Sequence, residues 1–316
     1  EGAGRGMKIL LVLIFAPLIT LALLYFLFPE QFVQLMRWLM RRRARVVRKT
    51  VTVDGRTWPY LEGGDRSKPT LVMVHGFGAD KDHWTFYAPW LTKDYHLIAP
   101  DLPGFGENDR DGELPFDVET QAARLKAFLG ALGIERPHLG GNSMGGWIAL
   151  RFAIDYPDRL RSLTLMNNAG IVGANESELQ KLAADRDYNP LVLASLEDAD
   201  RLIAFVVRKP THVPARLKPV IYADALRHRD LLDKIFWVIA DEMEQKPLND
   251  ELARVKVPTL IIWGRHDKLI DVSCVAVLEK GIAGSTAHIF EDVAHVPMIE
   301  APKATAMVQR EFLAKH

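Results

Sequence analysis

The spacing of hydrophobic and polar residues changes several times along the 316-residue chain. An uncharged apolar run fills residues 9–28, and apolar residues then recur every three or four positions over residues 29–49. Short apolar runs alternate with amphipathic stretches over residues 50–170 and 253–316, whereas residues 171–252 contain helical stretches without a convincing strand. Alternating strands and helices predict an α/β fold, in which a mostly parallel sheet has helices on both faces.

The apolar run at residues 9–28 contains 20 residues without a charge. As a helix it would be about 30 Å long, which is the thickness of a bilayer core. We therefore predict a transmembrane anchor over residues 7–28, preceded by an expression scar at residues 1–6. A buried core helix and a cleaved signal peptide are the alternatives. The signal peptide is disfavoured because the run is long and no small-x-small cleavage site follows it.

Residues 29–49 combine an apolar stripe with basic residues. The stripe recurs at three- and four-residue spacing and consists of Phe32, Leu35, Met36, Leu39 and Met40. The other side of the same helix is polar and carries Gln31, Gln34, Arg37 and Arg41. This pattern predicts an amphipathic juxtamembrane helix that lies at the membrane surface. Packing of a charged helix on the catalytic domain is the alternative, and self-association through the stripe is a third use.

Charge is unevenly distributed along the chain, although the formal net charge is zero. Residues 1–49 hold nine basic and two acidic residues, and residues 50–316 hold 31 basic and 38 acidic ones. Positive charge confined to one short segment argues against a nucleic-acid-binding protein. Because the basic cluster follows the predicted span, the positive-inside rule places the catalytic domain in the cytoplasm. The Met7-Lys8 start before an apolar run instead resembles an uncleaved export signal, so both orientations stay open.

The sequence Gly141-Asn142-Ser143-Met144-Gly145 lies between a short apolar run and a helical stretch. A strand, a tight turn and a helix, with glycine two residues before and after a serine, form the nucleophile elbow of α/β-hydrolases. The turn strains the serine backbone, and glycine removes bulk that would clash beside it. We therefore predict that Ser143 is a nucleophile; the alternative is a surface Gly/Ser loop.

Two further buried runs end in loops before the elbow. Residues 70–74 lead into His75-Gly76-Phe77-Gly78, and residues 95–99 lead into a loop that contains Asp101. In this fold the first of these loops and the residue after the serine each supply one amide to the oxyanion hole, so we assign the backbone N–H groups of Phe77 and Met144. His75 and Asp101 precede the serine in the chain, and we interpret both as structural.

Two residues in loops after later strands complete the order Ser, Asp, His that this fold requires. Asp267 follows the run at 257–263, and His295 follows the run at 286–290. A base must take the serine proton, and a carboxylate must fix the imidazole tautomer and stabilise its charged form. We predict Ser143, Asp267 and His295 as the catalytic triad. The alternatives are His266 or His288 for the base, and Asp271 or Asp292 for the acid.

The interruption at residues 171–252 is interpreted as a helical cap over the active site. It would exclude water and shape the substrate channel of a core formed by residues 50–170 and 253–316. The four expected cap helices span residues 176–186, 196–207, 215–225 and 230–244. The single cysteine excludes internal disulfides. Since no H-E-x-x-H spacing and no glycine-rich phosphate loop occur, we expect neither a metal nor a cofactor.

Several motifs together resemble one known group of enzymes. These are HGFG, DLPGFG, GNSMGG, KVPTLIIWGRHDKLIDVS and AHVPMIE, combined with a single N-terminal span. They are similar to membrane-anchored monoacylglycerol lipases of the α/β-hydrolase superfamily, and to bacterial inner-membrane phospholipases A and lysophospholipases. The resemblance implies the same triad and oxyanion donors, homodimers through the transmembrane and juxtamembrane helices, and a periplasmic catalytic domain on a single-pass inner-membrane anchor. The last expectation conflicts with the charge placement.

The expected reaction is hydrolysis of acyl esters of monoacylglycerols, lysophospholipids or phospholipids, with membrane lipids and fatty acid products as partners. Soluble carbon–carbon hydrolases of aromatic ring-cleavage pathways share GNSMGG and WGR-x-D and are the alternative enzymes. A non-catalytic ligand-binding protein of this fold is the alternative outside catalysis. The predicted anchor favours the lipid hydrolase, because a lipid substrate resides in the bilayer.

Overall fold

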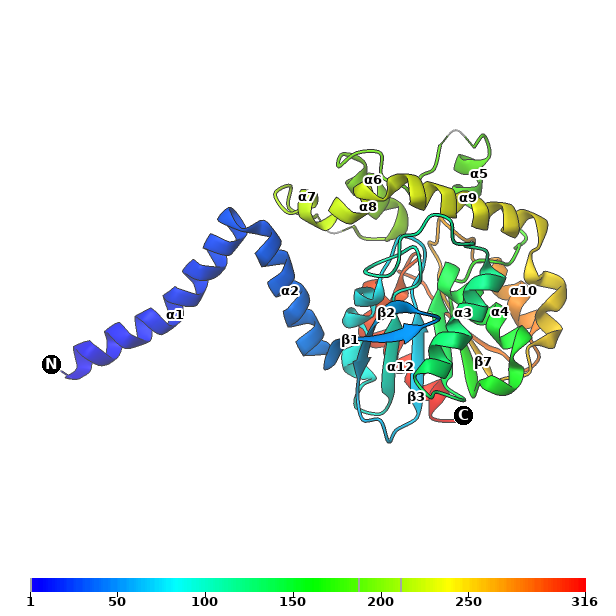
Figure 1. Ribbon diagram of the computed structural model, residues 1–316, viewed down its shortest axis with the longest axis horizontal. Coiled ribbons are helices and arrows are strands. Elements are labelled where there is room, and N and C mark those ends of the chain that lie inside the picture. Colours follow the sequence, from blue (N-terminus) through cyan, green and yellow to red (C-terminus); the bar gives the residue numbers. More distant parts are fainter. Residues whose placement is uncertain (1, 187, 211) are drawn as a thin grey trace.

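The computed structural model describes residues 2–186, 188–210 and 212–316, and for residues 2–12 and 14 it describes the backbone alone. The expected scar at residues 1–6 therefore lies outside the described side chains. Figure 1 shows a central sheet with helices on both sides, a group of helices over one end of it, and two N-terminal helices that extend away from the body. This arrangement confirms the α/β architecture that the sequence predicts.

Among the described residues, eight strands form one sheet in the order β1-β2-β4-β3-β5-β6-β7-β8. The β1–β2 and β2–β4 pairs are antiparallel, and all other neighbouring pairs are parallel. Asp54 and Gly55 join β1 to β2 with φ of 48° and 77°, as expected for a two-residue hairpin turn. The strands are β1 (Val46–Val53), β2 (Arg56–Gly63), β3 (Thr70–Val74), β4 (His96–Pro100), β5 (His138–Asn142), β6 (Ser162–Met166), β7 (Thr259–Gly264) and β8 (Thr286–Phe290).

A hydrophobic core lies on each face of the sheet. In β3, Val72 and Val74 belong to one core and Leu71 and Met73 to the other, as the two-residue period of a strand requires. Because both faces are covered, the central strands are buried along their whole length and read as continuous apolar runs. The covering helices of the first face are α3 (Val118–Ala131), α4 (Met144–Asp155) and α10 (Cys274–Gly281); those of the second are η1 (Lys81–Phe86), η2 (Ala88–Trp90) and α12 (Pro302–Leu313).

Two helices precede the sheet, α1 (Gly2–Leu27) and α2 (Pro29–Ala44). Helix α1 extends away from the body in Figure 1, and its C-terminal end meets the cap, where Arg216 Nε donates to the Tyr25 carbonyl oxygen at 3.0 Å. Most of the described side chains of α1 are apolar and exposed. No helix within the described part of the chain combines the length and hydropathy that a membrane crossing requires.

Helix α2 ends earlier than the helix predicted over residues 29–49. Arg45 follows it in the left-handed conformation, with φ of 56°, and β1 begins at Val46. Six of the eight residues of β1 are β-branched, which favours a pleated strand over a helix, and residues 46–53 pair with β2 along their whole length. The predicted boundary at residue 49 is therefore wrong, because residues 46–49 belong to the sheet.

The polar side of α2 packs on the body of the protein. Val33, Arg37 and Arg41 follow one another at four-residue spacing and share one helix face, and Val33 is buried. The Arg41 guanidinium donates two hydrogen bonds of 2.6 Å to the Asp82 carboxylate. On another side of the helix, Leu39 of the predicted apolar stripe is 43% exposed. The alternative of packing on the catalytic domain is thus correct for the polar face, while part of the apolar stripe stays uncovered.

The cap lies over the end of the sheet at which the parallel strands finish (Figure 1). The expected helix at residues 215–225 is divided in two at Tyr222, whose φ of −97° and ψ of 2° leave the helical region. The cap helices are α5 (Glu178–Ala183), α6 (Asp198–Val206), α7 (Lys218–Ile221), α8 (Ala223–Arg227) and α9 (Arg229–Gln245). The short helices η3 (Pro157–Arg159), η4 (Leu248–Arg254) and α11 (Pro297–Glu300) complete the described elements.

Candidate active site

Ser143 lies at the sharp turn between β5 and α4. Its backbone adopts φ of 56° and ψ of −123°, a conformation that non-glycine residues rarely take. A side chain at Gly141 would meet the carbonyl of Gly145, and one at Gly145 would meet the carbonyl of Val74. Glycine is therefore required at both positions for the turn to close. The predicted elbow is present, and it presents Ser143 at the edge where the parallel strands end.

His295 and Asp267 lie in the loops after β8 and β7. His295 Nδ1 is 2.9 Å from Asp267 Oδ2, and both side chains are buried. The other carboxylate oxygen of Asp267 accepts the backbone N–H groups of Leu269 and Ile270 at 2.8 and 3.1 Å. The carboxylate is therefore fixed in place, and its bond to Nδ1 leaves Nε2 of His295 as the nitrogen available for proton transfer.

Two asparagines that the sequence analysis did not select hold this pair. Asn167, directly after β6, donates through Nδ2 to Asp267 Oδ2 at 2.7 Å and to the Ala294 carbonyl at 3.2 Å. Asn142, directly before the serine, donates to the carbonyl of His295 at 3.0 Å. Asn167 has φ of 45°, which asparagine tolerates better than most residues. In the sequence, the available signal for Asn167 is an asparagine directly after a predicted strand, and no motif marks that position.

The two predicted oxyanion donors lie on either side of the serine. Phe77 is in the loop after β3, and a side chain at Gly76 in that loop would meet the Ser143 Cβ at 3.0 Å. Met144 is the first residue of α4, where helix geometry leaves the backbone N–H without an intrahelical acceptor. Phe77 also lines the cavity that contains Ser143, and the dipole of α4 favours negative charge at the serine; the oxyanion role of the two amides stays a prediction.

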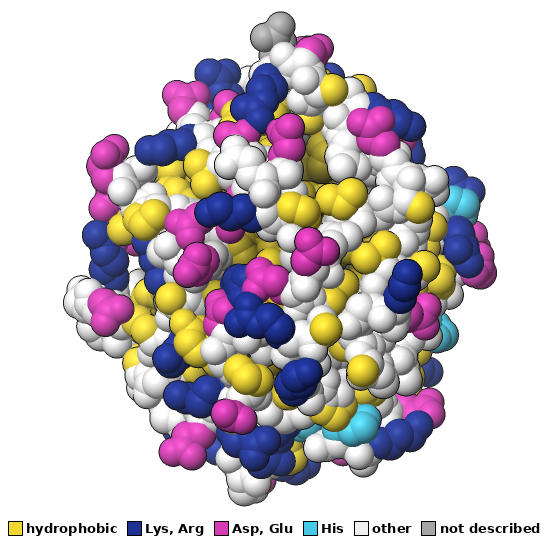
Figure 2. All heavy atoms as spheres, turned by 90° about the vertical axis from the view of Figure 1, so that its right-hand side faces the viewer, with side chains coloured by type: hydrophobic (Ala, Val, Ile, Leu, Met, Phe, Trp, Pro, Cys, Tyr) yellow, Lys and Arg dark blue, Asp and Glu magenta, His cyan; other side chains and the backbone are white. Residues whose placement is uncertain are grey.

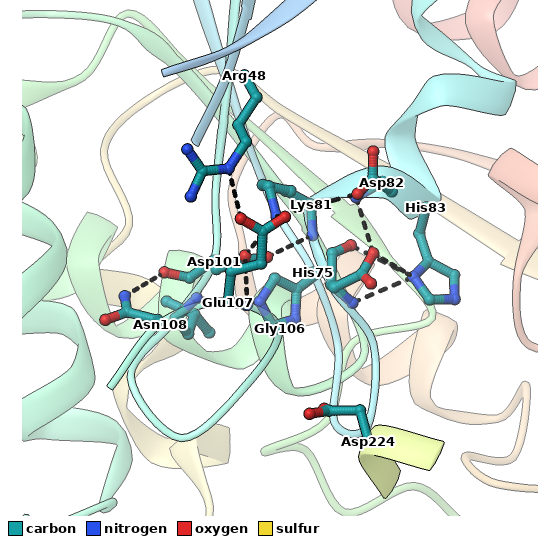
Figure 3. Close-up of polar contacts among 12 residues, drawn as sticks. Arg48, His75, Lys81, Asp82, His83, Asp101, Gly106, Glu107, Asn108 and Asp224 are labelled. Atoms are coloured by element: carbon teal, nitrogen blue, oxygen red, sulfur yellow. Dashed lines mark hydrogen bonds and ion pairs between the residues drawn. The ribbon is translucent and has the colours of Figure 1, made fainter. Parts of the chain in front are cut away.

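His75 and Asp101 are structural, as interpreted from the sequence. His75 Nδ1 bonds the Gly76 carbonyl at 2.8 Å, and Nε2 accepts the Leu102 N–H at 3.0 Å. Burial lowers the pKa of His75 to about 4, which is consistent with a neutral ring. Asp101 is fully buried and accepts both the backbone N–H and the Nζ of Lys81 at 2.7 Å. Figure 3 shows the contact between Lys81 and Asp101, which joins η1 to the loop after β4.

The four alternative triad residues lie apart from this arrangement. His266 and His288 are exposed, and His288 lies on the edge strand β8. Asp271 accepts the Ser273 N–H at 2.9 Å and fixes the turn before α10. Asp292 is exposed and pairs with Lys209. None of the four contacts Ser143 or the His295–Asp267 pair through a hydrogen bond in the described part of the chain.

One cavity of about 420 Å³ contains both Ser143 and His295. Apolar side chains of the cap form much of its wall and include Leu191, Leu193, Leu202, Ile203 and Val206. A second cavity, of about 650 Å³, lies beside Glu62 and His96 and is lined by none of the predicted site residues. Within the described residues, no group of three His, Cys, Asp or Glu side chains could hold a metal ion. The chemistry available at the first cavity is that of an activated serine in an apolar pocket.

The surface shows no extended region of one charge on the face drawn in Figure 2, where basic and acidic side chains are interspersed. Residues 69–302 match the family model described as alpha/beta hydrolase fold.

Two groups of relatives are similar over most of the chain. Lipase 1 from Psychrobacter immobilis is 35% identical over 275 residues, which cover 86% of each protein. The human monoacylglycerol lipase ABHD6 is 29% identical over 308 residues, covering 94% of this chain and 91% of the lipase. Because 94% of this chain is covered, the similarity to ABHD6 includes part of residues 1–49.

Two solved structures are also similar to this chain over most of its length. The crystal structure of a bacterial membrane phospholipase A is 38% identical, with a TM-score of 0.88 over 98% of both chains. A meta-cleavage product hydrolase from Pseudomonas fluorescens matches with a TM-score of 0.73 over 84% of this chain and 97% of its own, at 24% identity; it shares the fold. The chain therefore belongs to the α/β-hydrolase fold family, as a carboxylic ester hydrolase of the lipase and esterase type.

Proposed function

We propose that this protein hydrolyses acyl esters of glycerolipids through an acyl-enzyme on Ser143. The observation that carries the proposal is the hydrogen bond between His295 and Asp267 in the loops beside a strained serine. An apolar cavity bounded by the cap supports a fatty acyl chain as the group that binds there. Relatives named as lipases, a monoacylglycerol lipase and a membrane phospholipase A agree with this substrate class.

The reaction proceeds in two displacements. His295 Nε2 accepts the Ser143 hydroxyl proton as Oγ attacks the ester carbonyl, and Asp267 stabilises the resulting imidazolium. The backbone N–H groups of Phe77 and Met144 bind the oxyanion. The C–O bond to glycerol breaks, and His295 returns the proton to the leaving alkoxide. Water then attacks the acyl-serine with His295 again as base, which releases the fatty acid and restores the Ser143 hydroxyl.

The test of the nucleophile is active-site labelling with a fluorophosphonate probe. We expect wild type to be labelled at Ser143 and the Ser143→Ala variant to be unlabelled and without hydrolysis of 1-acylglycerol. Ser67→Ala serves as the matched control, because Ser67 is exposed and outside the cavity. Near-normal hydrolysis by Ser143→Ala would overturn the proposed mechanism.

We further propose that residues 7–28 anchor the protein in the cell inner membrane as a single span, with α2 lying at the membrane surface. Support comes from the exposed apolar side chains in the described part of α1 and from the uncovered Leu39 and Trp38 of α2. The same exposed side chains suit pairing of two copies through α1 and α2. The whole-chain likeness to a membrane phospholipase A agrees with an anchored protein.

The anchor is tested by fractionation of Leu18→Arg/Leu21→Arg, with Leu18→Ala/Leu21→Ala as control. Each arginine at the centre of a span costs about 2.5–3.5 kcal/mol in insertion, so we expect the arginine variant alone to leave the membrane fraction. Equal retention of both variants after alkaline extraction would contradict the anchor. Protease added to spheroplasts then distinguishes a periplasmic from a cytoplasmic catalytic domain.

A further inference from the structure

The cavity that holds Ser143 has a charged wall beside the oxyanion loop. Besides Tyr222 and the predicted base His295, five charged or titratable side chains line the cavity: Arg37, Asp80, His83, Arg110 and Asp224. Asp80 follows the oxyanion loop directly, and η1 with His83 continues from it. Asp80 and His83 therefore lie on the side of the cavity next to the oxyanion loop, whereas the apolar side chains of the acyl-binding wall come from the cap.

Four of these five side chains already have partners. His83 Nδ1 is 3.4 Å from Asp80 Oδ1, which also accepts the Asp82 N–H at 2.8 Å. Arg110 pairs with Asp224 and donates to the carbonyl oxygens of Gly104 and Gly106. Each acid in the wall is thus matched by a cationic or protonatable group, and together they add no strong net field.

Arg37 is the exception. It is half-buried in the wall of the cavity, yet it forms no hydrogen bond or ion pair with any residue in the described ranges, in contrast to Arg41 one turn later. Its charge acts on Asp80: burial would raise the pKa of that carboxyl, but the hydrogen bond from His83 and the charges of His83, Lys81 and Arg37 lower it. Arg37 therefore lines the same cavity as the oxyanion loop, and its guanidinium has donors to spare.

The position of Arg37 is set by a network that ties α2 to the loops of the active site. Arg41 binds Asp82 of η1 at 2.6 Å, and its guanidinium is 3.5 Å from Glu107. Buried Lys81 joins Glu107 to Asp101 through contacts of 2.9 and 2.7 Å, as Figure 3 shows. Because Arg37 and Arg41 share one helix face, fixing Arg41 on η1 holds Arg37 at the cavity.

Resting on the ester hydrolysis proposed above, we propose that Arg37 binds the phosphate of a lysophospholipid headgroup, so that the juxtamembrane helix contributes a specificity residue to the active site. In a lysophospholipid the phosphate and the acyl ester are attached to the same glycerol, so a phosphate must lie near any ester held at Ser143. A guanidinium presents parallel N–H donors that match phosphate oxygens. A monoacylglycerol has no group that could use this contact.

The experiment measures a selectivity ratio in the full-length protein in mixed micelles. The ratio is kcat/KM for 1-oleoyl-lysophosphatidylcholine divided by kcat/KM for 1-oleoylglycerol, two substrates with the same acyl chain. For Arg37→Gln we expect the ratio to fall by about 10- to 100-fold, as for loss of a hydrogen bond to a charged group. Arg37→Lys should restore part of the selectivity ratio, since lysine keeps the positive charge but lacks the planar, parallel N–H donors of the guanidinium. Arg43→Gln, an exposed arginine on the same helix outside the cavity, should keep the wild-type ratio.

The outcomes separate the phosphate site from the underlying reaction. Hydrolysis of p-nitrophenyl butyrate by wild type without hydrolysis of either lipid would overturn the proposed lipid hydrolase itself. Hydrolysis of both lipids with an unchanged ratio in Arg37→Gln, or with the same loss in Arg43→Gln, would overturn the Arg37 site alone. Added sn-glycerol 3-phosphate distinguishes the source of the phosphate. If it inhibits wild type but not Arg37→Gln while the lipid ratio stays unchanged, the site binds a free phosphate and the headgroup assignment is wrong.

Discussion

The edge of the parallel sheet and the cap face each other across one cavity, yet they are built differently. The serine, the aspartate and their asparagine supports lie at the ends of strands that are buried on both faces, and the histidine follows the partly exposed edge strand β8. In the cap, α5, α7 and α8 contain no buried residue. A region with few buried apolar contacts opens at lower free energy than a packed core. The reacting groups are therefore held more rigidly than the part of the cavity wall supplied by α7 and α8, whereas α6 on the same wall contains the buried Ala199 and Phe205.

Several hydrogen bonds connect the cap to the loops at the sheet edge, and one of them reaches the predicted base. The backbone N–H of His295 donates to the carbonyl oxygen of Val206, the last residue of α6, at 3.1 Å. Arg110 of the loop after β4 pairs with Asp224 of α8. If residues at the sheet edge catalyse the reaction and residues of the cap select the substrate, substitutions at the edge should lower the hydrolysis rates of all esters together. Substitutions in the cap should instead alter the preference among esters.

The largest effect is expected for Asp267→Asn at the sheet edge. Its amide can donate to Nδ1 and would favour the wrong tautomer of His295, so kcat should fall about 10⁴-fold for every ester tested. The measurement is steady-state hydrolysis of butyrate and oleate esters side by side. A loss confined to long-chain esters would mean that Asp267 acts through the cap, and the division between the two regions would fail.

A smaller loss is expected for Asn167→Ala, which removes both donors that Asn167 Nδ2 directs to Asp267 and Ala294. Loosening of the carboxylate should lower kcat about 10- to 100-fold without changing the order of substrates. Unfolding stability should fall by about 1–3 kcal/mol, because a buried acceptor loses its partner. The matched control is Asn249→Ala, which removes two hydrogen bonds to the backbone of Val172 outside the cavity; it should affect stability alone.

Asn167 also shows where prediction from the sequence stops. Ser143, Asp267 and His295 could be selected because their order and the loops after strands are constrained by the fold. Asn167 and Asn142 could not, since each acts through a contact with a residue distant in the chain. The partner of the polar face of α2 was unpredictable for the same reason. Helical periodicity distinguishes the polar face from the apolar one, but only the fold shows that Asp82 lies beside Arg41.

A change in the cap should have a different signature. Ile203 lines the cavity from α6, and Ile203→Trp adds bulk to the acyl-binding wall. We expect kcat/KM for oleate esters to fall about tenfold relative to butyrate esters, because a long chain needs the lost space and a short one does not. Leu182→Trp, which enlarges an exposed side chain elsewhere in the cap, should leave the chain-length profile unchanged. An equal loss for both chain lengths in Ile203→Trp would argue that the cap also positions the reacting groups.

The smallest effect should appear far from both regions, at Glu62 in β2. Its buried carboxylate accepts from Arg66 at 2.6 Å and from His96 at 2.9 Å, and Lys49 Nζ is 2.7 Å away. Burial alone would raise the pKa of Glu62, but the hydrogen bonds from Arg66, Lys49 and His96 lower it to about 2. Because the folded-state pKa lies below the unfolded value, the charged form stabilises the protein above about pH 4.5 and this contribution is lost as the pH falls toward 2.

Glu62→Gln should therefore reduce the free energy of unfolding by about 1–2 kcal/mol at pH 7, a figure discounted because Arg66 and Lys49 are largely exposed. The difference from wild type should shrink steadily between pH 5 and pH 3 in urea titrations, as expected for a carboxylate of unperturbed pKa near 4.3. Glu135→Gln, an exposed acid beside the same second cavity, is the control and should show a much smaller difference. Ester hydrolysis at pH 7 should be unchanged in both variants, since neither side chain lines the cavity of Ser143. A loss of activity in Glu62→Gln at full stability would show that the hairpin edge influences the active site. It would contradict the expectation that Glu62 contributes to stability alone.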